Sequence, residues 1–547
     1  MSEVAFLFAK KKYLLYRGFM NIDHKQAIAE ILRMKINNQS DLSLAKRAIA
    51  NKYGLPIFAN SELLRVYREL ILRHEIEKSS VLDRALRKRA VRTGSGVAPV
   101  AVLTMPWECP GTCAYCPRES DVPTSYLSNE PAVMRAIRCD YHPAVQVEDR
   151  LRALVANGHE PTKIELIVIG GTWSVLPEKY KYWYIKECFR AANDFSKISK
   201  FKKQIPNKFQ NSKFKIQNLK SELAEEQRRN EKAKYRLIGI TLETRPDYIN
   251  ERELLEMRTL GCTRVELGVQ AIDDEILKIN KRGHGVEAIA RATALLRDFG
   301  FKITYHLMPG LPGSTPAKDL KMFKQLFSDE RFQPDQIKFY PTVVTKGSLL
   351  YKWWKAGKYK PYTDKQLEKL IIDCKKVVPP YVRIIRLIRD IPSESIEAGN
   401  KMTNLRQIMQ QKGVECHCIR CRETKEYSIT NFQYSIIKYQ AAHGMEYFIQ
   451  AVGADGETLY GFCRLRIAGD KAMIRELHVY GDLVPMDGEK KVQHAGLGKL
   501  LMLEAEKIAC ENECPQISVI AGVGVRGYYR KLGYQLKKTY MVKKQNC

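Results

Sequence analysis

Three cysteines lie close together in the stretch ECPGTCAYCPRE, with the spacing C-x3-C-x2-C: Cys109, Cys113 and Cys116. Three thiolates in one short loop can hold a 4Fe–4S cluster and leave one iron open to an exogenous ligand. That arrangement suits S-adenosylmethionine, which binds the open iron and is cleaved reductively to give a radical. The alternative is a zinc knuckle, which usually needs four ligands and paired C-x2-C groups. The spacing therefore favours the iron–sulfur cluster.

Four further residues end strands that the sequence predicts after the cysteine loop: Gly170, Gly171, Glu243 and Gln270. The glycine pair would let the backbone approach a ligand closely. The carboxyl ends of barrel strands are where active sites lie. We expect these residues to contact S-adenosylmethionine, although each could instead be a satisfied polar residue at a barrel rim.

A second group of residues stands before the apolar stretch LLMLEAEKIAC. Gln493, Gly496 and Gly498 form a Q-x-x-G-x-G loop that opens a predicted helix. Backbone N–H groups at a helix N-terminus bind a pyrophosphate well. The loop resembles motif A of the GNAT acetyltransferases, which implies acetyl-CoA. Tyr528 and Tyr529 follow in GYYRKLGY, as core aromatics or as contacts to the thioester.

A third group lies in ECHCIRCRE, where Cys416, Cys418 and Cys421 fall within six residues. This density in a polar context predicts a metal, most simply zinc. The fourth ligand is not evident, and His417, Cys374 and His443 are the candidates. The alternative is three buried thiols.

The elements that must position these groups show a clear order. Short apolar, β-branched runs alternate with helical stretches, which predicts an α/β fold with a parallel sheet or partial (β/α) barrel. The seven runs are 100–103, 164–170, 237–244, 264–270, 302–308, 336–342 and 382–388. Residues 21–95 read as helices, and an α+β domain begins at about residue 428.

These patterns divide the chain into four predicted regions. They are a helical basic region at 1–96, which we expect to bind nucleic acid, a region at 97–395 that resembles the radical SAM superfamily, a Cys-rich linker at 396–427 and a region at 428–547 that resembles the GNAT acetyltransferases. Residues 193–235 are rich in Lys, Asn and Gln. We expect a surface insertion there, with a short helix near Ser221 to Glu231.

The charge balance points to a polyanionic partner. The 547 residues carry 91 Lys and Arg against 61 Asp and Glu, a net charge of +30, which favours nucleic acid. A charged fraction of 28% with 45% hydrophobic residues excludes a collagen-like or wholly disordered chain. The apolar start runs into Lys10, so no signal peptide is predicted and a cytoplasmic location is expected.

Radical SAM and GNAT patterns in this order resemble the catalytic (third) Elongator protein family in its prokaryotic stand-alone form. The resemblance rests on the following segments: 91–104, 130–143, 164–173, 239–248, 261–270, 281–285, 475–481, 493–498 and 527–534. It implies C5-carboxymethylation of the wobble uridine (U34) of tRNA with acetyl-CoA and S-adenosylmethionine. In the implied mechanism, a radical formed on the acetyl methyl adds to C5, and thioester hydrolysis leaves the carboxymethyl group. The alternative activity is protein lysine acetylation.

The resemblance also implies residue roles. It assigns acetyl-CoA contacts to Lys163, Glu476, Leu477, His478, Val479, Leu497, Gly498, Lys499 and Tyr529. Of these, Lys163, His478 and Tyr529 are the candidate catalytic residues, and His478 could orient a water or simply be packed. The basic run that would hold the backbone of the tRNA anticodon stem-loop comprises Arg84, Arg87, Lys88, Arg89 and Arg92. A reductant for the cluster is required, a homodimer is compatible with the sequence, and accessory Elongator-type subunits are not required.

Overall fold

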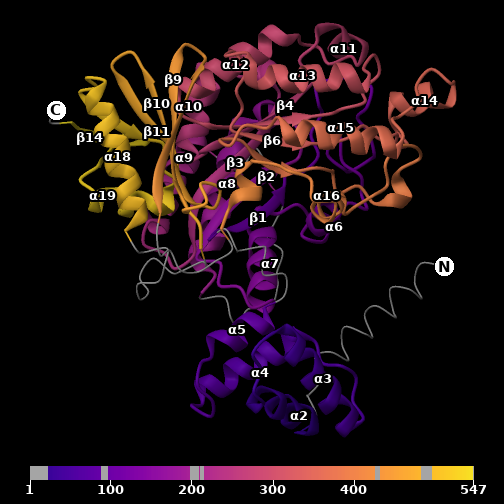
Figure 1. Ribbon diagram of the computed structural model, residues 1–547, viewed down its shortest axis with the longest axis vertical. Helices are drawn as coiled ribbons and strands as arrows, with labels where there is room; N and C mark the ends of the chain where they lie inside the picture. The colour runs from indigo at the N-terminus through magenta and orange to yellow at the C-terminus, as the bar shows by residue number, and fades with distance from the viewer. Residues whose placement is uncertain are drawn as a thin grey trace. The chain divides into compact units, whose positions relative to one another are not determined.

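The computed structural model describes residues 22–87, 96–196, 209, 215–424, 432–481 and 496–545 (Figure 1). Two compact units make up the chain. The first contains Met1–Arg92 and Arg152–Glu160, and the second contains Thr93–Leu151 and Pro161–Cys547. Within the described ranges, no helix is long and apolar enough to cross a membrane.

Four described helices build most of the first unit: α2 (Ile22–Arg33), α3 (Gln39–Tyr53), α4 (Asn60–Leu72) and α5 (Ser80–Leu86). Ile28, Ile31, Leu63 and Tyr67 recur at helical spacing and are almost fully buried in one apolar core. Asn38 caps the start of α3, because its side chain accepts hydrogen bonds from the backbone N–H groups of the first turn. The helices predicted for residues 21–95 are thus present.

The second unit contains a parallel sheet of seven strands in the order β1-β2-β3-β4-β5-β6-β7. The strands are β1 (Ala98–Leu103), β2 (Lys163–Ile169), β3 (Arg236–Thr244), β4 (Arg264–Gln270), β5 (Lys302–Leu307), β6 (Gln336–Phe339) and β7 (Arg383–Arg386). Each coincides with one of the seven predicted runs. Every neighbouring pair is parallel, which requires a crossover after each strand.

Helices supply these crossovers and follow the sheet. They are α6 (Pro131–Arg138), α7 (Pro143–Ala156), α8 (Glu178–Asp194), α9 (Ile216–Asn230), α10 (Glu251–Thr259), α11 (Asp274–Ile279), α12 (Val286–Asp298), α13 (Pro316–Ser328), α14 (Leu349–Lys355), α15 (Asp364–Lys376), α16 (Leu405–Gln411) and α17 (Ile419–Arg422). Short 3-10 turns are η2 (Trp173–Val175), η4 (Pro246–Tyr248) and η5 (Ser393–Ser395).

The sheet is strongly curled. Arg264 of β4 forms an ion pair of 2.9 Å with Glu165 of β2 and donates a hydrogen bond of 3.2 Å to Gln336 of β6. Side chains from alternate strands meet in this way inside a barrel. The sheet runs from β1 to β7 without a described pairing between these two strands, so the predicted partial barrel is confirmed.

A second seven-stranded sheet follows, in the order β13-β14-β12-β11-β10-β9-β8. Its elements are β8 (Gln433–Ala441), β9 (Gly444–Val452), β10 (Leu459–Ala468), β11 (Lys471–Val479), α18 (Leu497–Glu511), β12 (Gln516–Val519), η7 (Val523–Val525), α19 (Arg526–Lys531), β13 (Gln535–Lys537) and β14 (Tyr540–Lys544). Helix α18 lies against this sheet, and its Leu501 and Ala505 pack with Leu465 and Ile474 (Figure 1). A mixed α/β fold with a C-terminal sheet domain is therefore confirmed.

The helix expected in the insertion is longer than predicted. It is α9, which begins at Ile216 and packs on α8 through the buried Leu219 and Leu223. Asn230 is fully buried, donates to the Tyr235 carbonyl and accepts from the Leu237 amide. This half of the insertion is therefore an integral layer of the unit. Residues 197–208 and 210–214 lie outside the described ranges, and the predicted domain boundaries stay predictions.

Candidate functional site

The loop after β1 carries the three cysteines at the carboxyl edge of the first sheet. Arg282 lies 3.4 Å from the Cys113 sulfur through its Nη1, and Arg245 lies 3.8 Å from it. Gly111 lies beside them, and a Cβ there would stand 2.4 Å from the end of the Arg245 side chain, which would have to shift. The loop is thus folded around two guanidinium groups. A thiolate set next to fixed positive charge fits an anionic metal cluster.

The same charges favour ionised sulfur. The pKa of the Cys113 thiol is lowered to about 4 by the hydrogen bond from Cys116 and by the charges of Arg282 and Arg245. A cluster ligand must be the thiolate, so this environment prepares Cys113 for metal binding.

The predicted contacts to S-adenosylmethionine lie on the same edge. Gly170 follows β2 with φ of 137°, and a Cβ there would stand 2.0 Å from the Thr104 hydroxyl oxygen, so only glycine fits. Gly171 also has a positive φ, of 99°. Gln270 ends β4 with φ of 69°, and its Oε1 is buried with no hydrogen-bond partner among the described residues. A strained residue with an unsatisfied acceptor is typical of a ligand site.

Three polar side chains that the sequence did not single out, His306, Glu266 and Lys338, fill the interior of the curled sheet below this edge. His306 of β5 lies 3.0 Å from Glu266 of β4 and 3.6 Å from Glu243 of β3. Lys338 of β6 forms an ion pair with Glu266 as well. Although burial raises it, the charge of Lys338 and the hydrogen bond from His306 hold the pKa of Glu266 well below its usual range. Glu243, the predicted cofactor contact, also accepts a hydrogen bond of 3.0 Å from the Tyr126 hydroxyl.

Lys163 lies at the opposite edge of the sheet. It is the first residue of β2, whereas Gly170 follows the last, which separates them by on the order of 20 Å along the strand. Lys163 pairs with Arg236 of β3, whose Cβ stands 2.7 Å from the Cβ position of Gly524 in η7. The amino edge of the first sheet therefore adjoins the C-terminal domain. Burial lowers the pKa of the Lys163 ammonium to about 8.

The second sheet splits next to the predicted acyl-CoA residues. Strand β12 pairs with β11 only along Ala472–Ile474, whereas β11 continues to Val479. Among the described strands, none pairs with the last part of β11 on that side. This part of β11 contains the predicted acetyl-CoA contacts Glu476, Leu477, His478 and Val479.

Helix α18 begins beside this split. Its N-cap is Gly496, with φ of 86°. Gly498 faces the Tyr528 hydroxyl, because a Cβ at position 498 would lie 3.0 Å from that oxygen. That hydroxyl is buried with no partner among the described residues, and burial raises the pKa of Tyr528 to about 12. Tyr529 packs in the core of the domain, Leu497 is buried and Lys499 is exposed. Of the two tyrosines, Tyr528 is therefore the one that faces the glycine loop, whereas Tyr529, which the resemblance assigned to acetyl-CoA, packs in the core. Gln493 lies outside the described residues.

The side chains of two predicted contacts have structural partners. Glu476 accepts a hydrogen bond of 3.0 Å from Arg464 and forms an ion pair of 3.2 Å with Lys302 of β5. Although burial raises it, the charges of Lys302 and Arg464 lower the pKa of Glu476 to about 2. The ring of His478 stacks on Phe462 and lies 4.5 Å from the Tyr480 ring. Glu476 therefore offers a ligand its backbone, because its carboxylate is already paired.

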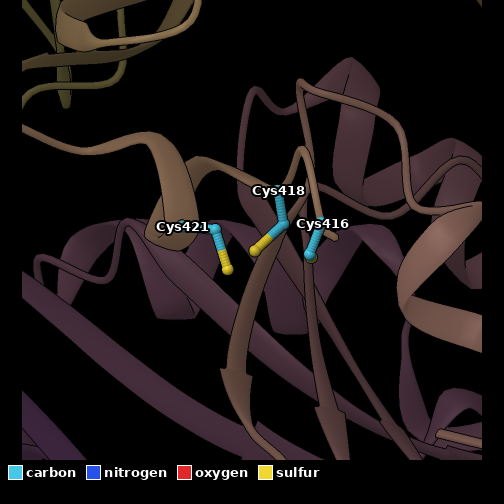
Figure 2. A group of neighbouring side chains, drawn as sticks. All are labelled: Cys416, Cys418 and Cys421. Atoms are coloured by element: carbon cyan, nitrogen blue, oxygen red, sulfur yellow. The ribbon is translucent and has the colours of Figure 1, made fainter. Parts of the chain in front are cut away.

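The three thiols of the Cys-rich segment gather in one place (Figure 2). The sulfur atoms of Cys416, Cys418 and Cys421 all lie within 4.8 Å of one another, and the Lys375 ammonium is 3.8 Å from Cys421. Hydrogen bonds from Cys416 and Cys421 lower the pKa of Cys418. Of the fourth-ligand candidates, His417 pairs with Glu415 and Glu457, and neither Cys374 nor His443 belongs to this group. The donor set fits a thiophilic ion such as zinc.

The predicted RNA-contacting run is described only in part. Arg84 lies in the last turn of α5, and Arg87 follows the helix. Lys88, Arg89 and Arg92 lie outside the described ranges.

Comparison with known proteins agrees with this geometry. The radical SAM superfamily matches residues 108–326, and the Radical_SAM C-terminal domain matches residues 334–413. The fold and the cysteine loop thus define a radical SAM protein with a further C-terminal sheet domain.

Several relatives are similar over most of the chain. A protein named tRNA uridine(34) acetyltransferase from Dehalococcoides mccartyi is 42% identical, over 83% of this chain and 99% of that protein. Elongator complex protein 3 of Homo sapiens is 36% identical, over 92% of this chain and 93% of that protein. The solved structure of the archaeal Methanocaldococcus infernus Elp3 with an N-terminal deletion superposes with a TM-score of 0.68 at 38% identity, covering 82% of this chain and 99% of that one. The chain belongs to the family of tRNA uridine(34) acetyltransferases and Elongator complex protein 3.

Proposed function

We propose that this protein carboxymethylates C5 of uridine 34 in tRNA, using acetyl-CoA as the acyl source and S-adenosylmethionine as the radical source. The observation that carries the proposal is the pairing of two sites in one unit. A cysteine loop with fixed positive charge lies at the carboxyl edge of a partial barrel, and a split acyl-CoA-type sheet adjoins its amino edge. The family relatives named for tRNA uridine(34) support the substrate.

The radical side of the reaction belongs to the carboxyl edge. Cys109, Cys113 and Cys116 would hold a 4Fe–4S cluster, and Gly170, Gly171 and Gln270 would contact S-adenosylmethionine. When bound, the pair supplies one-electron chemistry that can remove a hydrogen atom from an unactivated methyl group. The protein then has to hold charge and exclude water. Arg282 would balance the negative charge at Cys113. The hydrogen-bonded pair of His306 and Glu266, inside the sheet below the carboxyl edge, would exchange a proton.

The acyl side belongs to the amino edge and the second sheet. The backbone of Glu476–Val479 and the start of α18 at Leu497, Gly498 and Lys499 would hold acetyl-CoA. Tyr528 and Tyr529 would lie near its sulfur. Lys163 would reach the thioester from the first sheet, and with a pKa of about 8 roughly a tenth of it is the neutral amine at neutral pH.

The remaining partners follow from this chemistry. A reductant must deliver the electron, and the basic segment that includes Arg84 and Arg87 would hold the tRNA backbone. A zinc ion on Cys416, Cys418 and Cys421, a cytoplasmic location and a homodimer complete the proposal.

Nucleoside mass spectrometry tests the function directly. Anaerobically reconstituted protein incubated with tRNA, acetyl-CoA, S-adenosylmethionine and a reductant should yield a uridine heavier by one carboxymethyl group. Omission of S-adenosylmethionine should abolish the product, because the acetyl methyl is not acidic enough to attack C5 unaided. Unmodified tRNA together with acetylated protein lysines would reject the proposal in favour of a protein acetyltransferase.

The metal on the second cysteine group gives a separate prediction. Replacing Cys416, Cys418 and Cys421 with serine should remove about one zinc per chain, since serine is a poor ligand for this ion. Elemental analysis after dialysis measures the loss. The matched control is the alanine triple variant of Cys109, Cys113 and Cys116, which should keep its zinc. Equal zinc in the serine variant and the wild type would contradict the assignment.

A further inference from the structure

A cavity of about 360 Å3 opens at the carboxyl edge of the first sheet, apart from all the site residues discussed above. Its walls are the segment Gly310–Ser314 after β5, Trp353 of α14 and the segment Lys358–Tyr362. A volume near the lower limit for a ligand site suits a single ring-sized group rather than an extended cofactor.

The walls of this cavity are fixed by a buried carboxylate. Asp319 accepts hydrogen bonds from the Gly310 amide at 2.7 Å, the Ser314 hydroxyl at 2.6 Å and the Tyr362 hydroxyl at 2.7 Å. The Tyr359 hydroxyl donates to the Gly310 carbonyl at 2.7 Å. The cavity is therefore pre-formed, and binding there costs little reorganisation.

Direct hydrogen bonds join two of these walls to the cysteine loop. The amide of Ala114, which stands between Cys113 and Tyr115, donates to the Asn280 carbonyl at 3.0 Å, and the Asn280 side chain donates to the Pro312 carbonyl at 2.9 Å. On the other wall, the backbone N–H of Leu350, in the first turn of α14, donates a hydrogen bond of 2.7 Å to the Ala114 carbonyl. A ligand in the cavity would thus be held at a fixed position relative to the cluster loop.

The side chains at the cavity match the chemistry of a nucleotide. Trp353 and two tyrosines supply aromatic surface, and Lys358 and Lys360 line the cavity and are exposed, with no acid among the lining residues. Helix α14 adds Lys352 and Lys355 on the surface nearby. Aromatic rings interleaved with lysines hold unpaired nucleotides, because the rings stack on the base and the ammonium groups attract the phosphate.

We propose that this cavity binds one unpaired nucleotide of the RNA substrate, a neighbour of the uridine that is modified. The base would stack on Trp353, and its phosphate would lie at Lys358 and Lys360. The inference rests on the proposed function for the identity of the RNA. The cavity would hold the unpaired anticodon loop at a fixed position relative to the cysteine loop.

Binding of a short RNA stem-loop with an unpaired uridine, measured by fluorescence anisotropy at fixed salt, tests the stacking. Trp353→Ala should weaken binding of the stem-loop by roughly 5- to 100-fold, the effect of losing one base–aromatic stack, and leave binding of an equally charged RNA duplex unchanged. Trp353→Phe should restore most of the affinity, which separates stacking from a loss of folding. Unchanged stem-loop affinity of Trp353→Ala, or an equal loss for the duplex, would overturn the proposal.

The lysines are tested by the salt dependence of the same binding. Lys358→Gln with Lys360→Gln should lower the steepness of the log–log salt plot by about one to two units, since each lost phosphate contact removes nearly one. The matched control is Lys321→Gln with Lys324→Gln, which removes the same charge from exposed positions on α13. Equal slopes for the two double variants would contradict a phosphate site at the cavity.

The two proposals can fail separately. If wild-type protein binds the stem-loop through Trp353 but forms no modified uridine, the cavity stands and the proposed function falls. If wild type forms the product and Trp353→Ala binds and modifies RNA equally well, only the cavity inference falls.

Discussion

Replacing Cys109, Cys113 and Cys116 together with alanine is expected to lower the iron of anaerobically reconstituted protein from about four atoms per chain to nearly none. The reason is that these thiols lie on one loop, where Arg282 and Arg245 favour the thiolate of Cys113. Cleavage of S-adenosylmethionine should be lost with the iron, whereas acetyl-CoA binding by the second sheet should survive. Iron and sulfide analysis and calorimetric titration with acetyl-CoA measure the two effects.

The serine triple variant of Cys416, Cys418 and Cys421 is the control, since it also removes three thiols but should keep the iron. A further control is Cys188→Ala, which removes a fully buried free thiol elsewhere in the first sheet domain. Iron content unchanged by the first triple substitution would refute the cluster assignment.

The sequence predicted the strands well because their signal is local. Buried parallel strands appear as short apolar runs, and each of the seven predicted runs contains a strand. The cysteine groups were visible for the same reason, since their members lie within eight and six residues. The predicted start of helix α9 is five residues too late. Ile216 and Leu219 stand in a polar stretch of the sequence, and only the packing of α9 on α8 gives them an apolar surface to cover.

The residues that sequence reasoning missed all depend on pairing between distant segments. Arg282 stands in the quoted segment 281–285, yet its contact with Cys113 spans 169 positions. His306 looked like one polar residue in an apolar strand until the curl of the sheet brought Glu243 and Glu266 to it. A polar residue inside an otherwise buried strand was the available signal, because such a residue needs a partner.

The position of Lys163 changes how the two halves of the reaction are connected. Its place in the sequence, at the start of β2, does not say which end of the barrel faces the C-terminal domain. The contact of Gly522 and Gly524 with β3 places that domain at the amino edge, the end opposite to the cysteines. The interior side chains from Arg264 to His306 therefore lie between the cysteine loop and the C-terminal domain.

A buried ionic network joins the two sheet domains, and Asp335, just before β6, is its centre. Asp335 accepts two hydrogen bonds from Arg475 of β11, at 2.9 and 2.5 Å, and lies 3.5 Å from Arg464 of β10. Arg297 of α12 pairs with Glu446 of β9 at 2.9 Å. All of these side chains are almost fully buried. The network thus ties β11 to the first sheet, which carries the cysteine loop.

Asp335→Ala is expected to destabilise the protein by about 3–5 kcal/mol, because it removes the carboxylate that accepts two hydrogen bonds from the buried Arg475 and leaves Arg464 with Glu476 alone. Urea unfolding followed by circular dichroism measures the loss. The control Asp329→Ala breaks an ion pair with Arg331, whose side chain is half exposed, and should cost at most about 1 kcal/mol. A cost of Asp335→Ala as small as that of the control would show that the network contributes little.

The same network predicts how stability changes with acid. Although burial raises it, the charges of Arg475 and Arg464 hold the pKa of Asp335 well below its usual range, and the pKa of Glu476 is about 2. Because both folded-state values lie below the unfolded values of about 4, the stabilisation is fully present above about pH 4.5 and is lost as the pH falls toward 2. Wild type should therefore lose stability steeply across this window, and Asp335→Ala should lose it less steeply because one of the two carboxylates is gone. Parallel pH profiles of unfolding free energy for the two proteins would mean that Asp335 does not couple folding to protonation.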